Sequence, residues 1–318
     1  MKRTIVTGAS GFIGANLASR LVREGNETHV FARPGSDPWR LQAVQQDVRF
    51  HHVALEDADA LRQEVTRVRP DWVFHLAAHG GYSWQTDTHG IVQSNLEGTI
   101  NMLGACVAVG FEAFVNTGSS SEYGFTDHAP SEEEPAEPNS TYAVTKAAAT
   151  LFCRHVARSR NVQIATLRLY SVYGPFEESR RLVPTLILRG FGGELPPLVS
   201  PDTARDFVYI DDVIDAYLLA ASQPAPERGA IYNVGTGVQT TVREAVAVAR
   251  QVLDIRAEPR WQSMPDRGWD TTVWVADNQK IRSKLAWSPR YSFEQGFRRT
   301  VDWFHANPQW QQLYRKQD

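Results

Sequence analysis

Short apolar runs alternate with helical patterns through the first half of the chain. The runs with the length and composition of buried strands are residues 3–7, 28–32, 72–76, 113–117 and 163–169. Apolar residues recur at helical spacing in the segments after residue 12, at 61–68, near 90–109 and over 141–158. Because strands and helices alternate from the first residues onward, the pattern predicts an α/β fold with a doubly wound parallel sheet.

This alternation loosens after Leu169, where Pro and Gly become frequent. We therefore predict a first domain over residues 1–170, to which a segment at roughly 203–235 also contributes. The remaining residues, 171–202 and 236–318, mix short helical patterns with turns marked by Pro. They predict a second lobe at the C-terminal end, smaller than the first domain and of mixed α/β structure.

The composition excludes several classes of protein. Of the 318 residues, 42% are hydrophobic, which supplies a core and excludes global disorder. Lys and Arg (33) nearly balance Asp and Glu (36), so no basic field indicates a nucleic-acid partner. No apolar stretch is long enough to span a membrane, and the N-terminal one is interrupted at Gly8, unlike a signal peptide. Cys106 and Cys153 lack motif spacing and no His/Cys pattern indicates a metal, so we expect a cytoplasmic protein without metal ligands.

A glycine-rich segment follows the first predicted strand and opens the first predicted helix. Its glycines, Gly8, Gly11 and Gly14, have the spacing G-x-x-G-x-x-G. Glycines let the backbone approach a pyrophosphate, and the helix N-terminus offers N–H groups and a positive dipole end to it. The sequence therefore predicts that the first domain is a dinucleotide-binding (Rossmann) domain and the lobe binds the substrate. The predicted cofactor contacts in this segment are Gly8, Ser10, Gly11, Phe12, Ile13 and Gly14.

The end of the second predicted strand bears on which cofactor is bound. A dinucleotide site for NAD places an acid there to bind the ribose 2′-hydroxyl, whereas this chain has Arg33. A guanidinium at that position could pair with a 2′-phosphate, with Ser36 or Arg40 assisting. The sequence therefore favours NADP(H) and leaves NAD(H) open.

A tyrosine and a lysine one helical turn apart open the helix predicted over 141–158. Tyr142 and Lys146 share one face of that helix because of their i, i+4 spacing. A nearby ammonium and an oxidised nicotinamide would lower the pKa of a tyrosine from its usual value of about 10. Ser119, which follows the strand at 113–117, could hydrogen-bond the same substrate oxygen. We predict Ser119, Tyr142 and Lys146 as the catalytic residues.

With these motifs the chain resembles an extended short-chain dehydrogenase/reductase of the nucleotide-sugar epimerase/dehydratase family. The resemblance covers nearly the whole chain. Thr7–Gly14 resembles the family's cofactor motif and His75–His79 its L-A-A segment. Further matching segments are N-L-E-G-T at 95–99, L-R-L-Y-S-V-Y-G-P at 167–175, R-D-F-V-Y-I-D-D-V at 205–213 and Y-N-V-G-T-G at 232–237. Ser171 departs from the pattern, since the family has Asn there.

The resemblance implies further contacts and a partner. It implies a nucleotide-diphosphate sugar as substrate, its diphosphate held by Arg205 and Arg267, and a homodimer formed through the helices near 95–109 and 141–158. Its implied cofactor contacts are Leu55, Leu76, Ala77, Ala78, Tyr142, Lys146 and Tyr170. Its implied substrate contacts are His79, Tyr82, Ser120, Ser121, Ser171, Arg205 and Arg267.

One departure from the family pattern narrows the range of reactions that this chain is expected to catalyse. Sugar 4,6-dehydratases of this family place acids just after the catalytic Thr, where this chain has Ser120 and Ser121. Water elimination requires such an acid and base, so dehydration is disfavoured. Because Arg33 favours NADPH, we predict a nucleotide-sugar 4-ketoreductase. A 4-epimerase using tightly bound NAD, a reductase of a non-sugar ketone and, least favoured, a non-catalytic dinucleotide-binding protein remain as alternatives.

Overall fold

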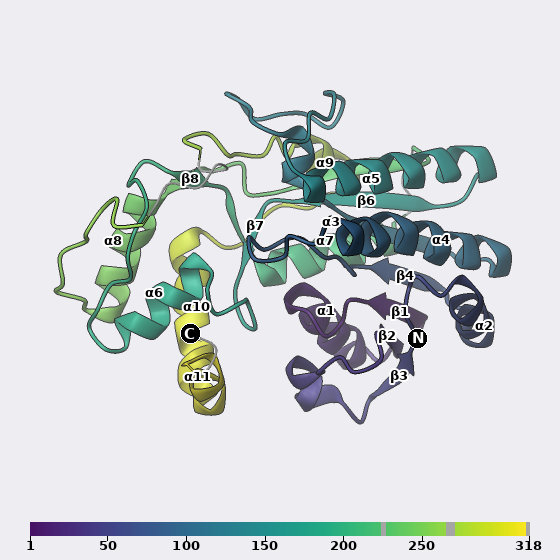
Figure 1. Cartoon of the computed structure of the whole chain (residues 1–318), viewed down its shortest axis with the longest axis horizontal. Coiled ribbons are helices and arrows are strands. Elements are labelled where there is room, and N and C mark those ends of the chain that lie inside the picture. Colours follow the sequence, from purple (N-terminus) through teal and green to yellow (C-terminus); the bar gives the residue numbers. More distant parts are fainter. Residues whose placement is uncertain (224–226, 265–270, 316–318) are drawn as a thin grey trace.

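The computed structural model describes residues 1–223, 227–264 and 271–315. Within these residues the main sheet has seven strands, which all run parallel (Figure 1). In spatial order they are β10 (Ala230–Val234), β6 (Ile164–Leu169), β5 (Ala113–Ser119), β4 (Trp72–His75), β1 (Arg3–Thr7), β2 (Glu27–Ala32) and β3 (Val48–His52). The chain adds strands on both sides of β1, so the sheet is doubly wound and the predicted fold class is confirmed.

Helices cover both faces of this sheet. The helices on one face are α1 (Phe12–Arg23) and α7 (Ile210–Ser222), and those on the other are α2 (Ala58–Val68), α4 (Gly98–Val109) and α5 (Thr141–Arg160). Successive strand residues point to opposite faces, so Val6 joins the core under α1 and α7 while Ile5 joins the core under α2 and α4. Both side chains are fully buried, which explains why such strands are continuous apolar runs in the sequence.

Several elements differ from the predicted pattern, and β10 is one of them, because no strand was predicted at 230–234. The helix predicted near 90–109 is divided into α3 (Thr88–Val92), a π-helical turn η2 (Gln93–Glu97) and α4. The strand β3 was not predicted, because its sequence Val-Arg-Phe-His-His is not an apolar run. It lies at the edge of the sheet beside β2, where its side chains are only partly covered. An edge strand needs fewer apolar residues than a central one.

The later segments build a second lobe, which lies at the left of Figure 1. Its helices are α6 (Leu182–Gly190), α8 (Val242–Leu253), α10 (Phe293–Ala306) and α11 (Pro308–Arg315). Two small sheets join it to the main domain: β7 (Ser171–Tyr173) pairs with β9 (Phe207–Tyr209), and β8 (Ala204–Arg205) pairs with β11 (Thr240–Thr241). The short helix α9 (Gln279–Leu285) contacts β10 of the main sheet instead. The exact domain boundaries remain a prediction.

Aromatic rings join the lobe to the main domain near the ends of its strands. Trp39 opens the 3₁₀ helix η1 (Trp39–Val44), and its ring centroid is 5.0 Å from that of Trp310 on α11. Phe176, in the segment after β7, contacts both tryptophan rings. The lobe is thereby packed against the carboxyl ends of the strands, where ligands bind in doubly wound folds. Among the described residues, no helix combines the length and apolarity needed to cross a bilayer.

Candidate active site

The turn between β1 and α1 has no room for side chains at two of its glycines. Gly8 has φ +68°, and a Cβ there would lie 2.7 Å from the backbone nitrogen of Ala77. A Cβ on Gly14 would lie 2.3 Å from the carbonyl oxygen of Gly8. The N–H of Gly11 donates to that same carbonyl at 3.0 Å, which closes the turn. Glycine is therefore required at positions 8 and 14, because neighbouring backbone atoms lie too close for a Cβ atom.

The amino end of α1 is suited to an anionic group. Its N-cap is Gly11, and no side chain caps the helix. The first N–H groups of any helix lack an intrahelical acceptor, and those of Phe12 and Ile13 come first here. Ser10 lies in the turn just before them. A cradle of small residues facing a helix N-terminus fits the pyrophosphate of a dinucleotide.

The segment after β4 is tied to this turn through one hydroxyl. The N–H groups of Leu76 and Ala77 both donate to Oγ1 of Thr7 at 3.1 Å. The His75 ring lies between Thr7 and Thr99, with nitrogen-to-oxygen distances of 2.9 and 3.0 Å. Burial, together with the nearby Lys146 ammonium, lowers the pKa of His75 to about 3, so the ring is neutral. The segment with the predicted contacts Leu76, Ala77 and Ala78 therefore lies beside the glycine turn, at the carboxyl ends of β1 and β4.

The residues predicted near the adenosine lie beyond the ends of β2 and β3. Arg33 is exposed directly after β2, and its carbonyl accepts from both the N–H and the hydroxyl of Ser36. The guanidinium of Arg40 donates to the carbonyls of Ser10 and Phe176 at 3.3 and 2.9 Å. Arg40 therefore fastens the glycine turn to the segment after β7. Leu55 follows β3 and is buried.

The predicted catalytic residues meet at the carboxyl end of β5. Ser119 ends that strand, and its Oγ lies 2.8 Å from Oγ of Ser121. The Ser119 hydroxyl is close enough to Tyr142 to lower the pKa of the phenol. Lys146 follows one turn later on α5 and is buried. The three residues singled out by the sequence are thus neighbours in space, as are Ser120 and Ser121 on the 3₁₀ helix η3 (Ser120–Tyr123).

Burial has the largest effect on the pKa values of Tyr142 and Lys146. Desolvation raises the pKa of Tyr142 to about 12, against the lowering by Ser119 and by the charge of Arg181. Desolvation also lowers the pKa of Lys146 to about 8, although the nearby Glu122 opposes the shift. Arg181 lies just before α6 and had no motif in the sequence to mark it. The protein surroundings therefore hold Tyr142 as a neutral phenol at neutral pH.

A buried carboxylate supports Ser119, the predicted catalytic serine. Glu122 is completely buried, and its Oε1 accepts from the N–H of Ser119 at 2.8 Å and from the Thr150 hydroxyl at 3.0 Å. Its Oε2 accepts from Nε of Arg168 at 2.9 Å. Sequence reasoning did not identify Glu122 as a site residue. The available signal was the S-x-x-E spacing from Ser119, which is a capping box and is formed here.

The N-x-x-G-T motif has a positioning role. The Asn95 side chain accepts from the N–H of His79 and donates to its carbonyl, both at 2.8 Å. It also donates to the hydroxyl of Thr145 at 2.9 Å, and that hydroxyl donates to the carbonyl of Tyr142. Asn95 is buried. It therefore fixes the loop after β4 against the first turn of α5.

The predicted substrate residues lie on several separate segments, each with its own local contacts. The Tyr82 ring is stacked on Trp84, with centroids 4.8 Å apart, and Arg180 lies 3.5 Å from the Trp84 centroid. The Ser171 N–H donates to the carbonyl of Asp206 at 3.0 Å. The Arg205 guanidinium lies 5.3 Å from the Trp274 ring centroid. Arg267 lies outside the described residues.

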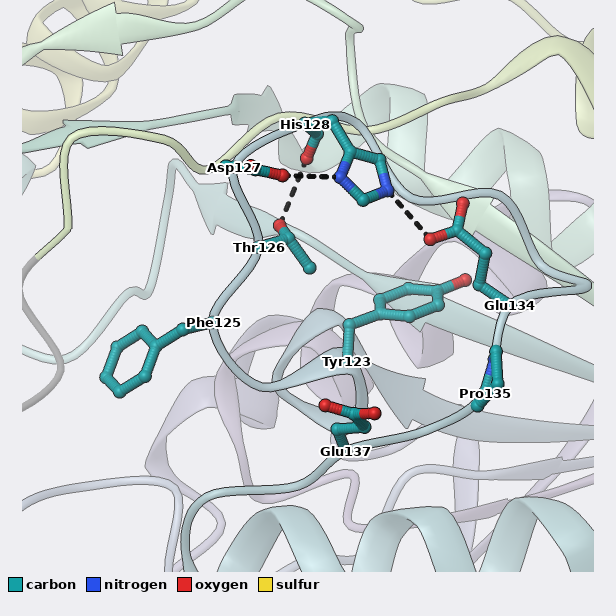
Figure 2. A pocket seen from close by; sticks show the side chains of 8 residues that line it. All are labelled: Tyr123, Phe125, Thr126, Asp127, His128, Glu134, Pro135 and Glu137. Atoms are coloured by element: carbon teal, nitrogen blue, oxygen red, sulfur yellow. Dashed lines mark hydrogen bonds and ion pairs between the residues drawn. The ribbon is translucent and has the colours of Figure 1, made fainter.

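A hollow of about 520 Å³ opens beside the end of η3 (Figure 2). The Tyr123 ring lies across it, and His128 bridges the carboxylates of Asp127 and Glu134 at 2.9 and 2.7 Å. Phe125 points away from the other side chains in this view. Within residues 1–223, 227–264 and 271–315, no cluster of His, Cys, Asp and Glu could hold a metal ion.

Comparison with known proteins agrees with this geometry. The sequence profile described as "NAD dependent epimerase/dehydratase family" matches residues 4–235. The chain is 30% identical to a UDP-glucose 4-epimerase of Mycolicibacterium smegmatis, over 96% of this chain and 100% of that protein. A solved UDP-glucose 4-epimerase of Thermus thermophilus in complex with NAD has a TM-score of 0.85 and 29% identity, covering 96% of this chain and 99% of that one.

Another relative is a trifunctional UDP-glucose 4,6-dehydratase, 3,5-epimerase and reductase of Arabidopsis thaliana. It is 27% identical over 97% of this chain, and the chain spans about half of that relative's length, 48%. The chain therefore belongs to the NAD-dependent epimerase/dehydratase family, whose matched members here act on nucleotide sugars.

Proposed function

We propose that this protein is a nucleotide-sugar 4-epimerase that oxidises and then reduces again the C4 position of its substrate, using a retained NAD. The observation that carries the proposal is the meeting of Ser119, Tyr142 and Lys146 beside the glycine turn. Family relatives at full length support it, because the epimerase of M. smegmatis matches from end to end.

In this reaction the chain's own residues handle the proton of the substrate oxygen. As a phenolate, Tyr142 would take the proton from the C4 hydroxyl and later return it, while Ser119 hydrogen-bonds the same oxygen. The phenolate requires the positive charges of the Lys146 ammonium and of a bound oxidised nicotinamide, which would lower the pKa that burial raises in the protein alone. Lys146 holds the nicotinamide ribose, and the glycine turn with α1 holds the pyrophosphate. When bound, NAD accepts a hydride from C4 and gives it back.

The acid–base groups beside Tyr142 argue against water elimination. Ser120 and Ser121 occupy the positions of the dehydratase acids, and hydroxyl groups cannot replace carboxyl groups in that step. The charge of the Glu122 carboxylate affects the pKa of Tyr142. Its oxygens, however, already accept hydrogen bonds from Arg168, Thr150 and Ser119, so Glu122 is not free to serve as the acid or base of a dehydration. The site is thus equipped for hydride transfer without dehydration.

The nucleotide end of the substrate would lie toward the second lobe. Arg205 and the Trp274 ring lie together there, and a guanidinium is suited to a diphosphate. The homodimer belongs to the same proposal. Ile100 on α4 and Val144 and Leu151 on α5 are apolar yet 37%, 50% and 59% exposed, and they offer a surface for a second copy.

The test is to denature the purified protein and identify any released nucleotide, then to incubate fresh enzyme with UDP-glucose and with dTDP-glucose. The proposal expects released NAD and formation of the C4 epimer without added cofactor. Release of no nucleotide, together with no epimer from either sugar, would overturn it.

Arg33 favours a second candidate, an NADPH-dependent 4-ketoreductase. Its exposed position directly after β2 is where the 2′-substituent of the adenosine ribose lies in dinucleotide-binding folds. This candidate expects a protein that binds NADPH more tightly than NADH in a fluorescence titration. It also expects reduction of a 4-keto nucleotide sugar with consumption of one NADPH per product.

A further inference from the structure

The loop that follows β4 lies against the predicted acid–base residue. A Cβ on Gly81 would lie 3.8 Å from Cε2 and 3.9 Å from Cζ of Tyr142, so the loop backbone packs on the phenol ring. The side chain of Gln85 closes the loop, because its Oε1 accepts from the N–H of Gly80 at 2.9 Å and from that of Tyr82 at 3.3 Å. The loop therefore borders the space in which a sugar would meet Tyr142.

An exposed tryptophan belongs to this loop, which spans residues 80–85. Trp84 is 44% exposed, and no other tryptophan among the described residues is exposed to that extent. Its ring is stacked on that of Tyr82, with parallel planes and centroids 4.8 Å apart. A ring left open to solvent gains less from burial than a core ring, so the contacts on its faces account for its position.

Arg180 contacts the Trp84 ring from a segment distant in the sequence. Its guanidinium carbon lies 3.5 Å from the ring centroid, the shortest such distance within the described residues. Its Nε also lies 3.4 Å from Oε1 of Glu178. A guanidinium over the face of a tryptophan is attracted by the ring even at an exposed site. The contact therefore joins loop 80–85 to the segment that leads into α6.

The segment that carries Arg180 is fixed by its own hydrogen bonds. The Thr185 hydroxyl donates to the carbonyl of Ser179 at 3.0 Å, and Ser179 is buried. The N–H of Arg181 donates to the carbonyl of Glu178 at 3.0 Å. Arg180 thus gives the loop a firm attachment, which two consecutive glycines at 80 and 81 cannot provide through side chains of their own.

We propose that Trp84 and Arg180 form a latch that holds loop 80–85 over Tyr142 and so retains the C4 ketone between the two hydride transfers. The inference rests on the proposed function. In that reaction C4 gives its hydride to the bound NAD and its hydroxyl proton to Tyr142, which leaves a ketone without a covalent link to the protein. If the ketone departs before the hydride returns, the cofactor stays reduced and the cycle stops. Loops that close over an active site prevent such losses.

Both latch residues are positioning residues. Neither is among the predicted contacts of the substrate or the cofactor, and both act through the loop that packs on Tyr142. Sequence patterns did not mark them, because the contact forms only when the segment before α6 is folded beside the loop after β4.

Another arginine provides a matched control. Arg243 on α8 lies 5.7 Å from the ring centroid of Trp261 and 3.2 Å from an oxygen of Asp202. Like Arg180, it is about half exposed and has one tryptophan and one carboxylate beside it. Arg243→Ala therefore removes a comparable surface contact outside loop 80–85 and outside the segment before α6.

The first experiment measures the latch itself, in the purified protein without added sugar. Hydrogen exchange of the amides in residues 80–85 is followed by mass spectrometry. We expect Arg180→Ala to exchange about two- to fivefold faster than the wild type, as for loss of one exposed cation–π contact. Trp84→Ala should exchange about tenfold faster, because the stack on Tyr82 is lost as well. Trp84→Phe keeps a ring and should lie closer to the wild type, and Arg243→Ala should match it.

The second experiment measures retention of the ketone. The same variants are incubated with UDP-glucose and with dTDP-glucose, and reduced nicotinamide is followed by its absorbance while released keto sugar is detected by mass spectrometry. We expect Arg180→Ala and Trp84→Ala to accumulate reduced cofactor and to lose activity over successive turnovers. Trp84→Phe should largely restore retention, and Arg243→Ala should behave as the wild type. All these side chains are exposed or half-exposed, so the melting temperatures are expected to change little.

Two results would overturn the inference. Wild-type exchange in loop 80–85 of both Arg180→Ala and Trp84→Ala would show that the contact does not hold the loop. Faster exchange without any reduced cofactor or keto sugar would show that the loop does not retain the ketone. A wild type that forms no epimer would overturn the proposed function and the retention role with it, whereas the exchange measurement would still decide whether the latch exists.

Discussion

Nε of Arg168 on β6 lies 2.9 Å from Oε2 of Glu122, and both side chains are buried next to Ser119. The guanidinium also lies 4.4 Å from the Tyr123 ring centroid. The other oxygen of Glu122 accepts from the Ser119 N–H, so the ion pair with Arg168 helps to fix the position of Ser119. Glu122 is therefore a positioning residue.

Glu122→Gln is expected to lower the free energy of unfolding by about 3–5 kcal/mol, because Arg168 would keep a buried charge without its counterion. Urea denaturation followed by circular dichroism measures the change. The control is Glu258→Gln. The Glu258 side chain is 81% exposed and pairs with Arg250, so losing this ion pair is expected to change the free energy of unfolding by less than about 1 kcal/mol. Equal stability of the two variants would contradict a structural role for the buried pair.

Tyr142→Phe is expected to reduce turnover of a nucleotide sugar by about 10²–10⁴-fold, because the proton-transferring hydroxyl is lost. Affinity for NAD and the melting temperature should change little. Steady-state kinetics with a calorimetric titration of NAD separates these effects. Tyr232→Phe serves as the control and should retain full turnover. A Tyr142→Phe variant with wild-type turnover would remove this residue from the mechanism.

Glu177→Gln is expected to change how stability depends on pH. Glu177 is 6% exposed, its Oε2 has no partner among the described residues, and burial raises its pKa to about 8. The folded state therefore holds a proton that the unfolded state releases between about pH 4.5 and pH 8. Its contribution to stability is complete below pH 4.5 and is lost as the pH rises to 8, with a limit of about 5 kcal/mol.

Melting temperatures of the wild type and of Glu177→Gln between pH 5 and pH 9 test this expectation. The wild type should lose more stability than the variant as the pH rises, because glutamine cannot ionise. Parallel curves would mean that the Glu177 carboxyl does not titrate in this range.

Leu151→Glu is expected to prevent formation of the proposed homodimer. Leu151 is 59% exposed on α5, and a charge there would be buried without a partner in an interface between copies. Light scattering coupled to size-exclusion chromatography should report a monomer. Val238→Glu changes a residue that is 64% exposed in the segment after β10, and this control should leave the dimer intact. A dimeric Leu151→Glu variant would place the interface elsewhere.

The sequence was sufficient to predict the fold class, because the central strands and the helices beside them leave local patterns of apolar residues. Central parallel strands are buried on both faces, so β1, β4, β5 and β6 are apolar runs that can be recognised without tertiary information. The glycine turn, Ser119, Tyr142 and Lys146 were predicted for a related reason. Their chemistry depends on short spacings along the chain, and the spacings survive in the sequence.

Other features depended on contacts between distant segments. Glu122 has its role only because Arg168, 46 residues away, is brought beside it. Arg181 reaches the surroundings of Tyr142 from the segment before α6, and no pattern in the sequence marks that approach. Side-chain charge is a property of the sequence, but its burial and its partners are not.

The sequence by itself determined the fold class and the central strands, and it singled out the glycine turn and the predicted catalytic side chains, because these follow from periodicity and short spacings. Only the tertiary structure decided that burial raises the pKa of Tyr142 and that the Glu122 carboxylate is paired with Arg168. These properties arise from desolvation and from which groups the folded chain brings together, and neither can be inferred from spacing along the chain.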